Sequence, residues 1–117
     1  MNKIFQKITV FTALFFAVFV LFAFANTNEK TVKIKTSAQC GMCKERIENH
    51  LSKQDGIIKA VLEVETAECT VKYDSTQITV DDIREEISSV GYDADEVKAS
   101  KRTYKKLPKC CKKPEDR

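Results

Sequence analysis

Residues 31–56 read TVKIKTSAQCGMCKERIENHLSKQDG, and this stretch decides the fold. Apolar residues alternate with lysines over residues 31–37, which is the two-residue period of a half-buried strand. Apolar side chains then recur at every fourth residue from 41 to 54, at Cys43, Ile47 and Leu51. The stretch therefore predicts a strand, a short loop and an amphipathic helix, ended by the Asp55-Gly56 turn signal.

Two cysteines, Cys40 and Cys43, lie at the predicted junction between strand and helix. A loop thiol and a thiol on the first helical turn can close on one ion, and the positive end of the helix favours their thiolate forms. Two thiolates suit a soft ion such as Cu(I) or Hg(II), whereas a structural Zn(II) site needs four ligands. A redox-active dithiol and a structural disulfide remain the alternatives for this pair.

Two further strands and a second helix follow along the chain. Alternating patterns predict strands over 57–65 and 69–74, and Thr79 with Asp82 predicts the start of a helix that ends at Gly91. Residues 92–99 can form a last strand. The order βαββαβ predicts an α+β, ferredoxin-like sandwich, in which a four-stranded antiparallel sheet carries both helices on one face.

The chain resembles the heavy-metal-associated domain family over residues 31–99. The resemblance rests on the order of elements, on the CxxC at 40–43, and on two short motifs, Asp55-Gly56-Ile57 and Val90-Gly91-Tyr92. The family includes copper chaperones, metal-binding domains of copper-transporting ATPases and the periplasmic mercury-binding protein. It implies that Cys40 and Cys43 ligate the metal and that Tyr92 lies near them. Ser37-Ala38-Gln39 stands where the family usually has Gly-Met-Thr.

The N-terminal 25 residues are predicted to be a secretory signal peptide, outside the folded domain. Lys3 and Lys7 precede an apolar run over 8–24, and Ala23-Phe24-Ala25 is a small-x-small cleavage signal. The run is at the short limit for a membrane span, so an uncleaved anchor is the alternative. We expect cleavage before Asn26, a linker over 26–30 and a secreted or periplasmic location.

The charge is divided between the domain and the C-terminal residues. Residues 26–99 hold 10 Lys and Arg against 15 Asp and Glu, a net charge of −5, whereas residues 100–117 hold 8 against 2, a net charge of +6. With two prolines and no apolar period, residues 100–117 are predicted to be a solvated basic tail. Alternatively, they contact anionic lipid, an acidic partner or their own domain. Cys110 and Cys111 in this tail are candidate auxiliary metal ligands.

The other candidate residues are not expected to ligate the metal. Cys69 alternates with core positions and is predicted to be a small buried apolar residue. His50 lies two helical turns after Cys43, too far to share an ion with it. Met42 is predicted to cover the cysteine pair or point to solvent rather than to ligate.

The sequence thus predicts a non-enzymatic, exported metal-binding protein that holds a soft ion and passes it on by thiolate exchange. The expected partner is a metal-transporting membrane protein or another metal-binding domain. We expect a soluble monomer and no nucleic-acid binding, since the basic run lacks interleaved aromatic residues. The alternatives are a thiol–disulfide oxidoreductase and a membrane-anchored sensor or scaffold. The prolines, Pro108 and Pro114, both lie in the tail, whereas a thioredoxin-like fold needs one facing the dithiol.

Overall fold

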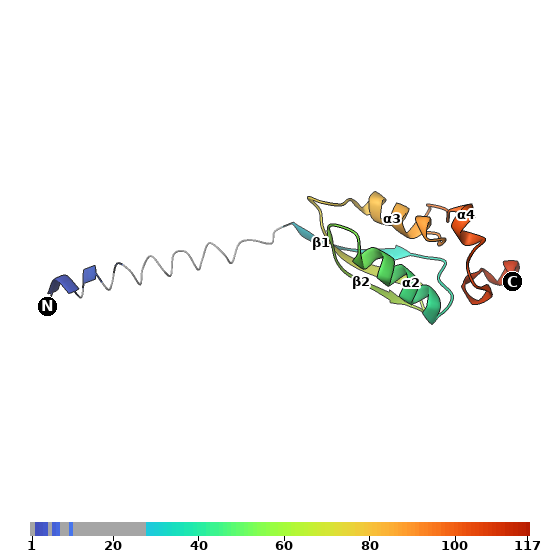
Figure 1. Ribbon diagram of the computed structural model, residues 1–117, viewed down its shortest axis with the longest axis horizontal. Helices are drawn as coiled ribbons and strands as arrows, with labels where there is room; N and C mark the ends of the chain where they lie inside the picture. Colours follow the sequence, from blue (N-terminus) through green and yellow to red (C-terminus); the bar gives the residue numbers. More distant parts are fainter. Residues whose placement is uncertain (1, 5, 8–9, 11–27) are drawn as a thin grey trace.

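The computed structural model describes residues 2–4, 6–7, 10 and 28–117 of the 117-residue chain. In Figure 1, three strands and two longer helices make up the domain, and short helices follow toward the C-terminus. The elements are β1 (Glu29–Lys35), α2 (Gly41–Ser52), β2 (Ile57–Glu63), β3 (Glu68–Asp74), α3 (Val80–Ser89), α4 (Lys101–Tyr104), η1 (Lys109–Cys111) and η2 (Pro114–Asp116).

The strands form one antiparallel sheet in the order β1-β3-β2. β1 pairs with β3 over its whole length, from Glu29 opposite Asp74 to Lys35 opposite Glu68. β2 pairs with the other edge of β3, with one irregularity near its start. The pairing of β1 with β3 brings the end of β1 close to the start of β3, which is where the chain enters the junction before α2.

One face of this sheet and the two longer helices enclose the hydrophobic core. α2 lies against β2 and contacts α3 beside it (Figure 1). The opposite face exposes Lys33, Lys72 and Glu63 to water. The α+β class and the helical cover on one face are therefore confirmed, and the fully buried residues of the core include Ile34, Ile47, Leu51, Leu62, Cys69, Val71, Ile83 and Ile87.

The end signals predicted for the second helix are present. Thr79 is the N-cap of α3, its hydroxyl accepts the N–H of Asp82 at 3.1 Å, and the Asp82 carboxylate accepts the N–H of Thr79 at 3.0 Å. Gly91 follows the helix with φ of +103°. A residue with a side chain adopts that backbone conformation only at a cost, so glycine ends the helix here.

The predicted fourth strand over 92–99 is wrong. Within the described residues, this stretch makes only isolated bridges, from Ala94 to Thr36 and to Val97. Asp95 has φ of +51°, so the chain turns back on itself instead of extending along β1. The Asp95 carboxylate accepts the N–H of Lys35 at 2.9 Å and binds Arg84 at 2.9 Å, which holds the turn against the edge of β1.

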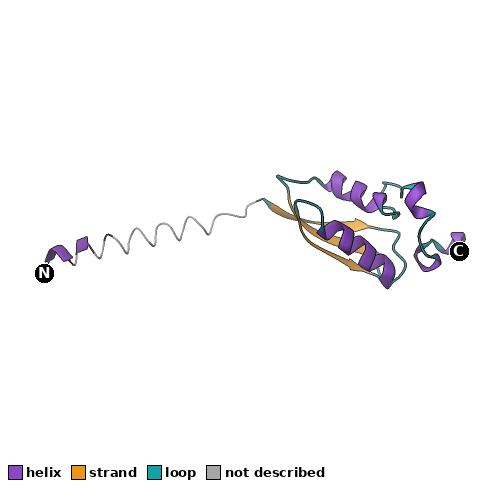
Figure 2. Cartoon of the chain, viewed as in Figure 1, coloured by secondary structure: helices purple, strands orange, loops and turns teal. Residues whose placement is uncertain are grey.

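The prediction of a solvated tail over 100–117 is also wrong. These residues, called the C-terminal segment below, contain α4, η1 and η2, and they bury Leu107 and Cys111 in the main core cluster. Figure 2 shows the short helices joined by loops beside the sheet and the longer helices. Apolar side chains recur at 104, 107 and 111, a helix-like spacing that the sequence interpretation overlooked.

The predicted signal peptide over 1–25 lies largely outside the described residues. Among the residues that the structure does describe, no helix is both long and apolar enough to cross a bilayer. β1 begins at Glu29, inside the stretch 26–30 predicted to be a linker, and the carbonyl of Asn28 accepts the N–H of Ser75 at 2.9 Å. The ordered domain therefore starts slightly earlier than the sequence suggested.

We predict that Gly91→Ala destabilises the domain by at least about 1 kcal/mol. The positive φ strains an alanine, and its Cβ would lie 3.1 Å from the Tyr104 nitrogen and 3.2 Å from the Thr103 carbonyl carbon. Gly41→Ala is the matched control, because a Cβ there meets nothing within 4 Å. Urea unfolding of the reduced protein measures both, and equal midpoints for the two variants would contradict the role assigned to Gly91.

Candidate metal centre

The junction between β1 and α2, residues 36–40, is held by hydrogen bonds to two other loops. The Thr36 hydroxyl donates to the Ala67 carbonyl at 2.8 Å and accepts the N–H of Ala38 at 3.2 Å. The Ser37 hydroxyl accepts the N–H of Asp93 at 2.9 Å. Ala38, which stands in place of the larger Met expected from the family resemblance, is 3% exposed and belongs to the main core cluster.

The junction places the two CxxC sulfurs 3.4 Å apart. Cys40 is the N-cap of α2 and half-buried, whereas Cys43 lies on the first turn and is fully buried. The N–H of Gln39 donates to the Cys43 sulfur at 3.4 Å. The two thiols therefore face each other across the junction as predicted, with Cys40 half-buried and Cys43 in the core.

The Cys40 thiol has a lowered pKa. Burial alone would raise it, but the backbone N–H of Cys43 and the thiols of Cys110, Cys43 and Cys111 together lower the pKa to about 7. A substantial fraction of Cys40 is therefore thiolate at neutral pH, which is the form that binds metals and attacks electrophiles.

The C-terminal segment brings two more thiols to the same place. Figure 1 shows this segment, in red, at the end of the domain where α2 begins. The Cys111 sulfur lies 3.7 Å from that of Cys40 and 3.9 Å from that of Cys110. The sulfurs of Cys40, Cys110 and Cys111 all lie within 4.8 Å of one another. Sequence reasoning offered the two C-terminal cysteines as auxiliary ligands but gave no geometry for them.

Tyr92 completes the inner side of the sulfur cluster. Its side chain is fully buried, and its hydroxyl makes no hydrogen bond within the described residues. Burial raises the pKa of this hydroxyl, and the neighbouring sulfurs of Cys111 and Cys43 raise it further. The hydroxyl thus stays protonated beside two sulfurs, where it can donate a hydrogen bond to a thiolate.

The remaining candidates lie away from this cluster or at its rim. Cys69 is fully buried in β3, and burial raises the pKa of its thiol to about 12. The thiol is therefore protonated and unreactive at neutral pH. His50 pairs with Glu86 at 2.7 Å on the flank of α2. Met42 is 51% exposed, and its sulfur lies 3.6 Å from that of Cys110. Met42 is therefore at the rim of the cluster, as the sequence predicted.

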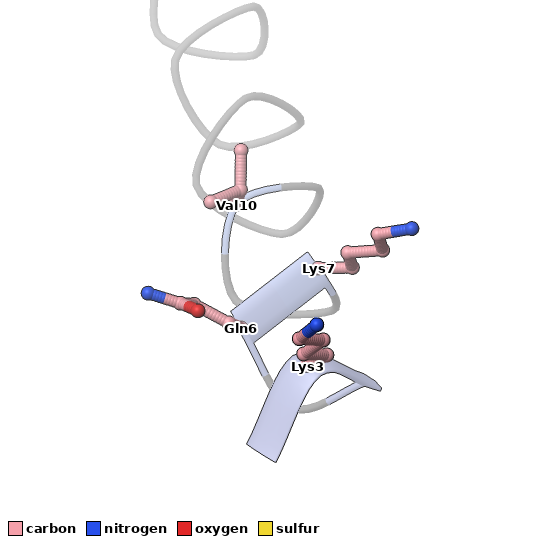
Figure 3. A pocket seen from close by; sticks show the side chains of 4 residues that line it. All are labelled: Lys3, Gln6, Lys7 and Val10. Carbon is pink, nitrogen blue, oxygen red and sulfur yellow. The ribbon is translucent and has the colours of Figure 1, made fainter. Parts of the chain in front are cut away.

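A hollow on the described N-terminal residues lacks the thiols of the sulfur cluster. Figure 3 shows its lining side chains pointing outward from the chain; they are Lys3, Gln6, Lys7 and Val10. None of the four carries a thiol, an imidazole or a carboxylate. These residues offer no ligands for a soft ion.

Fold and site together define a class: a small α+β domain with a dithiol at a strand-to-helix junction. The model of the heavy-metal-associated domain matches residues 35–93. The chain belongs to this family, and the match includes Cys40, Cys43 and Tyr92. The C-terminal segment, with Cys110 and Cys111, lies outside it.

Individual proteins agree with this assignment. The copper chaperone CopZ of Staphylococcus aureus is 33% identical over 54 residues, which cover 46% of this chain and 79% of the chaperone. Among solved structures, the chain is similar to the Cu(I)-loaded N-terminal domain of a potential copper-translocating P-type ATPase from Bacillus subtilis. That likeness has 25% identity and a TM-score of 0.55, over 57% of this chain and 85% of the domain. Oxidized MerP from Ralstonia metallidurans CH34 shares the fold, at 22% identity and a TM-score of 0.55 over 57% of this chain and 94% of MerP.

We predict that Cys40 is the first cysteine to be alkylated in the metal-free, reduced protein. Its rate should rise as the pH increases through about 7, because the thiolate is the nucleophile. Cys110 is exposed, but the neighbouring Cys40 thiol raises its pKa, so it should react more slowly at neutral pH. Timed iodoacetamide labelling with peptide mapping measures both rates.

Cys69 supplies the internal control for this experiment, since it should stay unmodified until the protein unfolds. If Cys40 reacts only as the pH approaches about 8.5, like an ordinary cysteine, the electrostatic account of its thiolate is wrong.

Proposed function

We propose that this chain is an exported, non-enzymatic metal-binding protein that holds one soft ion between Cys40 and Cys43 and passes it on by thiolate exchange. The observation that carries the proposal is the pairing of an accessible, low-pKa thiol with a buried thiol 3.4 Å away. Cu(I) and Hg(II) are the ions that such a pair suits best, because soft thiolates favour soft ions of low coordination number.

The asymmetry of the pair supports transfer rather than permanent retention. Cys43 is buried in the core, and its sulfur accepts the N–H of Gln39. Its sulfur is therefore held in place and would keep its bond to the ion during transfer. Cys40 lies partly open to solvent at the helix N-terminus, so an incoming thiolate can reach the ion beside it. Exchange can then proceed one sulfur at a time, without releasing a free ion.

The proposed partner is a metal-transporting membrane protein, or a soluble domain of the same kind as this one. Support comes from the relatives, which include a copper chaperone and a metal-binding domain of a P-type ATPase. Copper therefore leads among the proposed cargoes.

Export is proposed from the N-terminal sequence alone. The basic start, the apolar run over 8–24 and the Ala23-Phe24-Ala25 signal support removal of residues 1–25. A secreted or periplasmic location is oxidising, and a bound ion would protect the thiols from disulfide formation there.

The first test is anaerobic Cu(I) titration of the reduced protein against a competing chelator. We predict that the Cys40→Ser/Cys43→Ser variant loses affinity by at least roughly 100-fold, or about 2.8 kcal/mol. Cys69→Ala is the control, since it removes a thiol from the core and leaves the site intact. Unchanged Cu(I) affinity in the double serine variant would refute the proposed site, and catalysed reduction of insulin disulfides would favour the oxidoreductase instead.

The second test addresses export. We predict that protein purified from its native cell envelope begins at Asn26, because the small-x-small signal ends at Ala25. Intact mass and N-terminal sequencing measure this directly. A chain that still begins at Met1 would argue for the membrane-anchored alternative.

A further inference from the structure

The C-terminal segment is anchored so that its two cysteines face the CxxC pair. Leu107 is 6% exposed and packs at Gly91, where its Cδ1 atom lies 3.3 Å from the position of an added Cβ. Lys113 forms an ion pair with Asp93 at 2.7 Å. Burial would raise the pKa of Asp93, but this ion pair and the N–H of Ala99 hold it below its ordinary value. The segment is thus tied to the loop after α3 on both sides of the cysteines.

The segment also stabilises its own conformation. The Tyr104 hydroxyl accepts the N–H of Lys113 at 3.0 Å and donates to the Asp116 carboxylate at 2.6 Å. η1, which carries both cysteines, contacts α2. Cys111 is 1% exposed, whereas Cys110 remains open to solvent. The positions of both thiols are therefore set by folded structure and not by a mobile tail.

The spacing of the sulfurs fits a site with more than two thiolates. With a metal–sulfur bond of about 2.3 Å, a tetrahedral site separates its sulfurs by about 3.8 Å, and a linear pair by about 4.6 Å. The sulfur of Cys40 lies 3.4 Å from that of Cys43 and 3.7 Å from that of Cys111, and the Cys110–Cys111 sulfurs are 3.9 Å apart. These three values lie near the tetrahedral edge. The sulfurs that all lie within 4.8 Å of one another are those of Cys40, Cys110 and Cys111, so a four-thiolate site also requires a side-chain rotation that brings in Cys43.

The charge of the segment suits the same site. A divalent ion bound by four thiolates carries a net charge of −2, since each thiol gives up its proton to solvent on binding. Residues 100–117 carry a net charge of +6, with Lys109 and Lys112 directly flanking the cysteine pair. Nearby positive charge offsets the negative charge of the complex. In the metal-free protein, burial raises the pKa of Cys111, so its proton is released only when the ion binds.

We propose that Cys110 and Cys111 ligate metal together with Cys40 and Cys43, and that the resulting four-thiolate site takes a divalent d10 ion of the Zn(II) and Cd(II) class. This inference rests on the proposed function, because it uses the same CxxC pair. It extends that function to ions that a dithiolate alone binds weakly, since Zn(II) prefers four ligands.

Cd(II) titration of the reduced full-length chain tests the proposal. The thiolate-to-Cd(II) charge-transfer absorbance per bound ion scales with the number of thiolates. We expect Cys110→Ser/Cys111→Ser to lose about half of it, and Cys110→Ser alone to lose about a quarter. Cys110 is exposed, so the single variant should not disturb folding. Cys69→Ala is the matched control and should keep the full absorbance.

The outcomes separate this inference from the proposed function. Full absorbance per ion in both the Cys110→Ser and the double C-terminal variant overturns the four-thiolate site, while the CxxC assignment survives if Cys40→Ser/Cys43→Ser shows the predicted loss of Cu(I) affinity. If that CxxC variant keeps the Cu(I) affinity of the unmodified protein, the proposed function fails regardless of the Cd(II) result. Circular dichroism of each variant confirms that the fold is retained.

Discussion

The junction between β1 and α2 is the constraint on which the rest of the structure depends. Thr36 and Ser37 use their hydroxyls to tie it to the β2–β3 turn and to the loop after α3. The same junction must leave Cys40 partly open while Cys43 enters the core. Because three loops converge there, a change in any of them alters the position of both sulfurs. The metal chemistry is therefore a property of the packed domain, not of the CxxC motif alone.

Local patterns in the sequence predicted most of the fold. The alternation around Ile34, the four-residue stripe of α2 and the capping box at Thr79 each act over a few residues, so they can be recognised without the tertiary structure. The fourth strand failed for the opposite reason. The Asp95 carboxylate binds the Lys35 N–H and the Arg84 guanidinium, which holds the chain in a turn. Lys35 lies 60 residues away in the sequence, so this contact could not be recognised locally.

Part of the candidate site could likewise be predicted from local sequence, and part could not. Cys40 and Cys43 were predictable because their spacing and their place before a helix are local features. The approach of Cys111 was not, because it depends on Leu107 fitting against Gly91 and on Lys113 pairing with Asp93. The charge division between the domain and its C-terminal residues left an intramolecular contact only as one alternative to the predicted solvated tail. The contact between the C-terminal segment and the domain is seen only in the tertiary packing.

A tethered pair of thiols changes the energetics of metal transfer. Thiols held on the same folded chain compete with an incoming partner as intramolecular ligands, so their competition does not depend on protein concentration. If Cys110 and Cys111 ligate the ion, a partner must first displace them, or must bind the C-terminal segment and lift it from the loop after α3. The contacts of Leu107 and Lys113 then set how readily the ion leaves, because they hold the competing thiols in place. Retention and delivery of the ion would thus be governed by a docking equilibrium outside the CxxC motif.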